Sequence, residues 1–241
     1  MKRIYLLVLL TALALPLAAV SARASGSGSI VVGEVFAAGG NSSAAYSNDY
    51  VELFNRGASS VAIDGWTLQY ASASSTSWQS TALSGSIPAG GRYLVKLASG
   101  GTNGAALPTP DATGTANLAV TGGKVAVVNN ATALSCGSSA GSCSAVSSVQ
   151  DLVGYGSATD FEGSDDAPAG SATNAIVRAG GGCTDTDDNA ADFSTASPPP
   201  RTRPRQRARA RRRRRRGAPA DRQESTSTSS RCSRSRSTTR R

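Results

Sequence analysis

Short runs of β-branched and aromatic residues recur along the chain, and each is bounded by Gly, Asn or Asp residues that suit tight turns. The runs are Ile30–Phe36, Tyr50–Phe54, Val61–Ile63, Trp66–Tyr70, Arg92–Leu97, Lys124–Val128, Val149–Tyr155 and, more weakly, Asn174–Arg178. No window beyond residue 24 keeps the apolar period of about 3.6 residues that marks a helix. Short strands without crossover helices predict an all-β fold, namely an immunoglobulin-like antiparallel β-sandwich.

The N-terminus has the pattern of an export signal. Two basic residues precede an apolar run over residues 4–20, and residues 22–24 (Ala-Arg-Ala) have the small-x-small form of a cleavage site. The alternative is an uncleaved membrane anchor, but the run spans 17 residues, fewer than the roughly 20 that cross a bilayer. We therefore expect a signal peptide at residues 1–24, cleaved after Ala24, and a secreted, extracellular protein.

Charge divides the mature chain into two parts. The sequence of 241 residues carries a net charge of +9, but residues 25–200 carry −9 and residues 201–241 carry +15. The last segment holds seventeen arginines and lacks Leu, Ile, Val, Phe, Tyr and Trp, so it cannot form a core. We expect a β-sandwich domain at residues 25–200, followed by a disordered Arg-rich C-terminal tail at residues 201–241.

The tail has two interpretations. As a polycation it would bind nucleic acid or an anionic membrane through phosphate contacts, with an affinity that falls as salt rises. Its densest charge is the run Arg211, Arg212, Arg213, Arg214, Arg215 and Arg216. Arginine without lysine, among Ser, Thr, Ala and Pro, is also typical of a GC-rich gene read in the wrong frame. The tail is therefore either an anion-binding arm or the out-of-frame end of a longer protein.

Four cysteines in an exported chain favour disulfides. Cys136 and Cys143 stand seven residues apart in a Gly/Ser-rich segment, and a bridge between them is the simplest assignment. Cys183 is then left over, and Cys232 lies in the tail. Pairing of Cys183 with one of the first two cysteines is the alternative, and spacing does not decide between the two assignments.

The chain has no histidine. It therefore cannot build a Ser-His-Asp or Cys-His nucleophile, a His-based zinc site, or the His-dependent acid/base pair of many nucleases. Glu34 and Glu52 lie on predicted strands without a nucleophile or a basic partner in view, so we expect them on solvated strand faces rather than in acid/base catalysis. The composition predicts a protein that is not an enzyme.

An acidic segment near the end of the domain is a candidate metal site. Asp185, Asp187 and Asn189 stand at the first, third and fifth positions of a calcium loop, and Asp192 follows nearby. Alanines replace the glycine and the bidentate glutamate that such a loop requires. The alternative is a polar turn that closes the last strand, in which Asp and Asn side chains bind nearby backbone amides. No cofactor is expected apart from this calcium ion.

The sequence also predicts the surroundings of Trp78 and of a second acidic group. Trp78 lies in a Ser/Thr-rich stretch, which makes it a candidate for an exposed contact. A second acidic group comprises Asp160, Glu162, Asp165 and Asp166. We expect these four side chains to decorate a solvated loop.

Five segments of the chain carry a resemblance to a known domain family in their order and spacing. They are IVVGEVF (30–36), DYVELFNRGASSVAIDGWTLQY (49–70), IPAGGRYLVKL (87–97), TGGKVAVVN (121–129) and VQDLVGYG (149–156). In these segments the chain resembles the lamin tail domain in its secreted bacterial form, over about Ile30 to Ala196. The resemblance implies a compact immunoglobulin-like β-sandwich without catalytic residues of its own. The insert at residues 71–81 and the cysteine loop depart from the family pattern.

Together these observations predict an exported, non-enzymatic β-sandwich module for binding or tethering at the cell exterior, with an unidentified extracellular or cell-surface ligand. Domains that this one resembles are found alone or beside nuclease, phosphatase or immunoglobulin-like domains. The alternative is therefore an N-terminal accessory domain of a truncated or frameshifted secreted nuclease or phosphatase.

Overall fold

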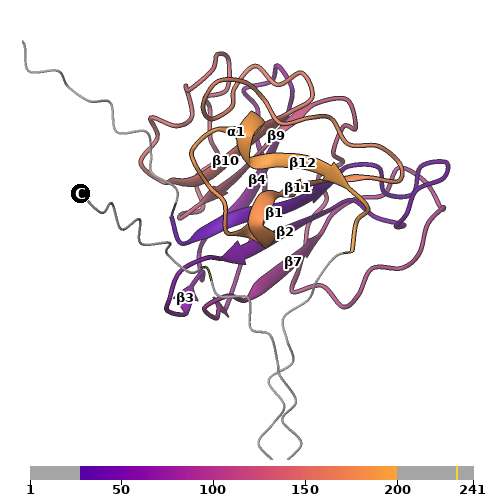
Figure 1. Ribbon diagram of the computed structural model, residues 1–241, viewed down its shortest axis with the longest axis horizontal. Coiled ribbons are helices and arrows are strands. Elements are labelled where there is room, and N and C mark those ends of the chain that lie inside the picture. The colour runs from indigo at the N-terminus through magenta and orange to yellow at the C-terminus, as the bar shows by residue number, and fades with distance from the viewer. Residues whose placement is uncertain (1–27, 200–231, 233–241) are drawn as a thin grey trace, which may run out of the picture.

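Two β-sheets form the body of the computed structural model, which describes residues 28–199 together with Cys232 (Figure 1). The first sheet has the spatial order β12 (Phe193–Ala196), β11 (Ala175–Arg178), β1 (Ile30–Phe36), β2 (Tyr50–Asn55), β7 (Arg92–Lys96) and β8 (Ala112–Thr113). The second has the order β10 (Val149–Tyr155), β9 (Gly123–Val128), β4 (Thr67–Ser72) and β5 (Gln79–Ala82). A two-stranded ribbon joins β3 (Val61–Ala62) to β6 (Ser86–Ile87).

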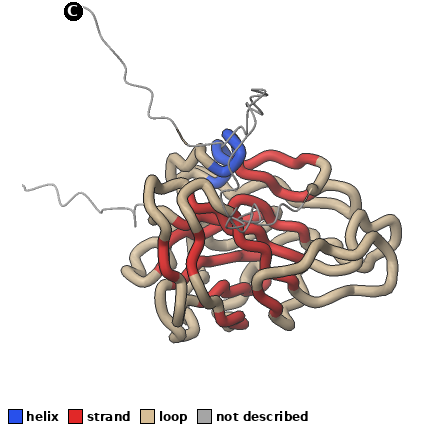
Figure 2. Tube along the Cα trace, turned by 90° about the horizontal axis from the view of Figure 1, so that it is seen from below, coloured by secondary structure: helices blue, strands red, loops and turns tan. Residues whose placement is uncertain are grey.

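Nearly all the strand pairs are antiparallel, and only β7 and β8 pair in parallel among the strands described. The helical segments are a 3₁₀ turn η1 (Ala179–Gly182) and one turn of α-helix α1 (Asn189–Asp192). Figure 2 shows how little helix accompanies the strands and how far the loops extend beyond them. The prediction of an all-β, immunoglobulin-like antiparallel sandwich is confirmed.

The predicted strands coincide with the observed ones, and two of them, β1 and β10, have the predicted bounds. The Asp64-Gly65 turn before β4 is also observed, with Gly65 at a φ of +78° that a side chain would disfavour. Four short strands (β5, β6, β8 and β12) were not expected. They are rich in Ser, Thr and Ala and have no apolar alternation, so their pairing depends on the neighbouring strands rather than on local pattern.

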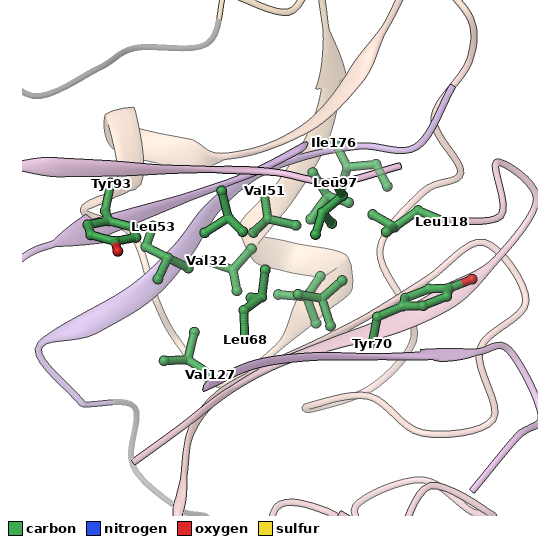
Figure 3. Packing of buried hydrophobic residues seen from close by; sticks show 14 of the residues in the cluster. Val32, Val51, Leu53, Leu68, Tyr70, Tyr93, Leu97, Leu118, Val127 and Ile176 are labelled. Carbon is green, nitrogen blue, oxygen red and sulfur yellow. The ribbon is translucent and has the colours of Figure 1, made fainter. Parts of the chain in front are cut away.

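The main core lies between the two sheets. Val32 and Leu53 of the first sheet point toward Leu68 and Val127 of the second (Figure 3). These four side chains are at most 2% exposed, and full burial of an aliphatic side chain of this size contributes roughly 1.5–3 kcal/mol. The alternating positions of β4 and β9 therefore hold the sheets together.

The outer face of the first sheet is also covered, which corrects the expectation for two glutamates. Glu34 accepts a hydrogen bond from the Tyr50 hydroxyl at 2.5 Å, and Glu52 forms an ion pair with Arg92. Both carboxylates are buried rather than solvated. The stacked rings of Tyr50 and Phe36, 5.5 Å apart, cover this face of β1 and β2, so a carboxylate placed there needs a donor.

Asp49 is a buried carboxylate that joins two loops just before β2. Its Oδ1 accepts a hydrogen bond from the Gly39 amide at 2.7 Å, and its Oδ2 accepts one from the Leu118 amide at 2.8 Å. Burial raises the pKa of Asp49 from 3.8 to about 6, and the two amides offset only part of that effect. Burial raises the pKa of Tyr70 and Tyr155, and the charge of Asp49 raises both further.

We expect Asp49 to make the stability of the protein decrease as pH rises from acid to neutral. The pKa of Asp49 is higher in the folded state than in the unfolded state, so the folded state binds the proton more tightly. The stability gained from this proton is complete below the unfolded pKa of 3.8 and is lost as pH rises through about 6. Asp49→Asn removes the titration and turns an amide NH₂ toward a backbone donor, at a cost of about 1–3 kcal/mol. Denaturant melts should show a larger gap between wild type and Asp49→Asn near pH 4 than near pH 7. A gap that grew with pH would contradict the assignment.

Among residues 28–199 and Cys232, no helix combines the length and the apolar character needed to cross a membrane. The signal peptide predicted at residues 1–24 lies outside the described residues, as does the tail at residues 201–241 except Cys232. The domain boundaries at residues 25 and 200 therefore stay predictions.

Candidate functional site

A buried cluster of charged side chains joins the end of β11 to β10 and α1. Arg178, the last residue of β11, has a fully buried side chain. Its Nη2 donates to both carboxylate oxygens of Asp151 on β10 at 2.9 Å, and its Nη1 donates to Asp185 Oδ1 at 2.8 Å. Nη1 also lies 3.4 Å from Asp192 Oδ2, and the guanidinium carbon lies 4.4 Å from the centre of the Phe193 ring. One cation thus binds three carboxylates from three segments.

The same cluster completes the hydrogen bonding of β1. The register between β1 and β11 runs through Glu34 and Val35, so the peptide groups of Val32 lie beyond it. The Arg178 Nε donates to the Val32 carbonyl at 2.8 Å, and the Val32 amide donates to Asp151 Oδ2 at 2.6 Å. Because β1 and β10 belong to different sheets, Asp151 links the two sheets at this edge.

Glu162, in the loop after β10, lies beside these carboxylates and is 4% exposed. Burial, and then the negative charges of Asp151 and Asp185, raise the pKa of Glu162 from 4.5 to about 9, against the opposing effect of Arg178. Burial also raises the pKa of Asp151 to about 6, although Arg178 lowers it. The cluster contains more acidic than basic groups, and this excess makes ionisation of Glu162 unfavourable.

At least three of the four residues of the predicted calcium loop bind protein groups. The four residues are Asp185, Asp187, Asn189 and Asp192. Asp185 and Asp192 bind Arg178, and Asp192 also accepts from an amide of its own turn at 2.7 Å. The Asn189 side chain donates to a carbonyl and accepts from an amide of β10, at 3.0 and 2.8 Å. Asp187 occupies a turn with a φ of +56°. Of these contacts, the bond from the Thr186 amide to Asp192 is the kind that a polar turn would make, and calcium at this loop stays a prediction.

The second acidic group does not decorate a solvated loop as a whole. Asp160 is fully buried, and its Oδ2 accepts from the Ser142 hydroxyl at 2.8 Å and from the Cys143 amide at 2.9 Å. Glu162 is buried as described above, whereas Asp165 is exposed. The expectation was wrong for the two buried side chains because they are covered by segments distant in sequence, which local composition does not reveal.

Trp78 is buried, so the prediction of an exposed contact was wrong. The side chain is 6% exposed, and its Nε1 donates to the Cys136 carbonyl at 2.9 Å. The ring packs in a second apolar cluster with Val128 and Val149. Lys124 Nζ lies 5.9 Å from the ring centre, within the range of a cation–π contact.

Lys124, on β9, is a buried cation that holds three loops in place. Its Nζ donates to the carbonyls of Ser75 and Gly137 at 2.8 and 2.6 Å, and to the Thr159 hydroxyl at 3.2 Å. Burial lowers the pKa of Lys124, with the charge of Asp160 acting in the opposite direction. The lysine therefore acts as a structural donor at this end of the sandwich.

Both disulfides of the chain are formed, and one of them corrects the sequence assignment. Cys136 and Cys143 are bonded as predicted, with their Cα atoms 5.2 Å apart. Cys183, expected to be left over, is bonded to Cys232 of the tail, with a Cα separation of 5.5 Å. The sequence spacing of 49 residues gave no reason to join these two, and only the folded arrangement brings them together.

Removing the local bridge should destabilise the protein moderately. The double variant Cys136→Ser/Cys143→Ser is expected to lose about 2 kcal/mol of unfolding free energy, because so short a loop restricts the unfolded chain only modestly. Denaturant melts of oxidised protein check this value, with Ser139→Ala in the same loop as a control. Mass spectrometry of the non-reduced protein should give a peptide joining Cys136 to Cys143, and free thiols at both positions would rule the bridge out.

Sequence reasoning missed Arg178, Asp151 and Lys124 as site residues. A signal for them was present, because each charged residue stands within or at the end of a predominantly apolar run: AIVR, VQDLVGY and GKVAVV. A charge in a strand that is buried on both faces must find a partner. The identity of that partner could not be read from the strand itself.

Comparison with known protein families identifies the family to which the fold belongs. The model of the Lamin Tail Domain family matches residues 23–155, more than half of the chain. No curated protein matches. Residues 156–199, which supply β11, α1 and β12, lie beyond the matched range, as do Glu162, Arg178 and Asp185. The match, together with the two antiparallel sheets, shows that this chain belongs to the lamin tail domain family, a family of structural immunoglobulin-like domains.

Proposed function

We propose that the protein is an exported, non-enzymatic module that binds or tethers at the cell exterior. The observation that carries this proposal is the pairing of all four cysteines in two disulfides, which suits an oxidising compartment. The export pattern of residues 1–24 agrees with it. The absence of histidine and the structural character of the family support a role without catalysis.

The tail is the proposed binding element. It carries +15 against −9 on residues 25–200, and its Cys232 is bonded to Cys183, directly after η1. A polycation joined to the domain at residue 200 and again through Cys232 would stay close to the domain while its arginines contact an anionic polymer. Binding of this kind rests on phosphate or sulfate contacts and weakens steeply with salt.

The test compares two full-length mature proteins, the wild type and a variant with Arg211 to Arg216 replaced by glutamine. Duplex DNA and vesicles containing anionic lipid serve as separate probes at low and high salt. The wild type should bind at least one probe in low salt, and the variant should bind more than tenfold less tightly, since roughly one released counterion is lost per phosphate contact. Equal binding by both proteins, or no binding by the wild type, would refute the role of the tail.

Export is tested separately by expressing the complete chain in a secreting bacterial host. The product outside the cytoplasm should begin at Ser25 and contain no free thiol. A product that stays in the cytoplasm with its N-terminus intact would contradict the proposal.

A second candidate is an accessory domain of a secreted nuclease or phosphatase whose remainder is missing. The composition of the tail, with arginine but no lysine, favours it, whereas the Cys183–Cys232 bond favours the frame as read. Reading the other two frames of the gene beyond the Pro198 codon tests it. An open frame with a metal-site motif would support this candidate, and early stop codons in both frames would exclude it.

A further inference from the structure

Three carboxylates from separate segments converge at the edge where β1 meets β10. Asp151 comes from β10, Glu162 from the loop that follows, and Asp185 from the turn before α1. Each offers one oxygen, and the three oxygens all lie within 4.8 Å of one another. The side chains of Asp151 and Asp185 are fully buried, and Glu162 is 4% exposed.

Glu162 Oε2 is the atom that indicates a ligand. It is inaccessible to solvent and has no hydrogen-bond partner among residues 28–199 and Cys232. A buried carboxylate oxygen without a donor is unfavourable by more than a neutral group would be. The other carboxylates of the cluster are bound by Arg178, so Glu162 is left facing two acidic groups.

The net charge of the cluster matches the charge of one divalent cation. Four carboxyl groups (Asp151, Glu162, Asp185 and Asp192) face two guanidinium groups, those of Arg178 and Arg56. With every carboxyl ionised, the cluster carries two negative charges in excess. Uncompensated charge in a buried position is strongly unfavourable, and one divalent ion would balance it.

We propose that Asp151, Glu162 and Asp185 form a binding site for one hard divalent cation, with the oxygen preference of calcium. Calcium binds carboxylate oxygens at about 2.3–2.6 Å, so two oxygens on opposite sides of the ion can be about 4.8 Å apart. Magnesium binds at about 2.0–2.1 Å and retains several waters, which a cluster this buried accommodates poorly.

The arginines need not exclude the ion. An ionised carboxylate has about four lone-pair positions, and Arg178 takes one on Asp185 Oδ1 and a share of those on Asp151. Arg178 therefore orients two of the ligands. The bound ion would join β10, the loop after it and the segment before α1, and so hold the C-terminal segment against the sandwich.

The test uses the full-length mature protein and its thermal midpoint in calcium, in magnesium and in chelator. Calcium at about ten times the dissociation constant should raise the midpoint by about 3–6 °C, and equilibrium dialysis should give one ion per chain. The expected dissociation constant is about 10⁻⁴–10⁻³ M, as in extracellular modules. Asp165→Asn, on the same loop as Glu162 but exposed, is the matched control and should respond as the wild type does.

Glu162→Gln should abolish the calcium shift. Because the glutamine amide is neutral and can donate to the neighbouring carboxylates, the variant should also have a higher midpoint in chelator. Asp185→Asn is the second variant and should also lose the shift, which keeps the test decisive if one variant fails to fold. The site is refuted if calcium does not move the wild-type midpoint, if Glu162→Gln responds as strongly as the wild type, or if magnesium alone stabilises. None of these outcomes depends on the tail, so they leave the proposed function untouched.

Discussion

Replacing Arg178 with methionine is expected to lower the free energy of unfolding by about 3–5 kcal/mol, the range for breaking a buried ion pair on one side. The variant fills much of the same volume but leaves Asp151, Asp185 and Asp192 without their shared cation. It also removes the donor to the Val32 carbonyl, at 2.8 Å in the wild type. Equilibrium denaturation of the oxidised protein measures the loss.

Two controls separate charge from geometry. Arg178→Lys keeps the positive charge but cannot donate to Val32, Asp151 and Asp185 at once, so its loss should be intermediate. Arg56→Met removes a cation that is 27% exposed, 3.0 Å from Asp185 Oδ2, and should cost about 1 kcal/mol or less.

Acidification should partly rescue Arg178→Met, because protonated carboxyls no longer need the cation. A variant as stable as the wild type, or one destabilised further by mild acid, would refute this role of Arg178.

Replacing Lys124 with methionine is expected to cost about 2–4 kcal/mol, since one buried and one partly buried carbonyl each lose a charged donor at about 1–3 kcal/mol apiece. The carbonyls are those of Ser75 and Gly137. With the loops released, Trp78 should become more accessible, so acrylamide should quench its fluorescence more strongly. The half-buried Lys96 gives the control variant Lys96→Met, which should change neither quantity appreciably.

Proteolysis gives an independent measurement for Lys124→Met. Cleavage within residues 134–145 should become faster in the variant, while strands β1 and β2 stay protected. Unchanged stability and unchanged quenching would mean that the loops are held by the Cys136–Cys143 bridge alone.

The alternation and turn chemistry of the sequence determined the central strands of both sheets. Strand β1 is predominantly β-branched, β10 is predominantly apolar, and turn residues follow both, so local preference and burial agree there. The local disulfide was also accessible from sequence, because Cys136 and Cys143 are close along the chain. The same reasoning could not find β5 or β8, whose residues are strand-forming only once a neighbour supplies hydrogen bonds.

The burial of polar side chains was decided by the tertiary structure alone. Trp78 and Asp160 stand in polar segments, and Glu34 is the one charged residue of an apolar strand, yet each is covered by residues from other segments. The partners of Arg178 come from positions 6 to 146 residues away, and Cys183 meets Cys232 across 49 residues. Periodicity reports which face of a strand is apolar, whereas the pairing of a buried charge depends on which distant segments pack over it. The sequence by itself therefore determined the sandwich, and only the packing of distant segments decided the ionic cluster at its edge.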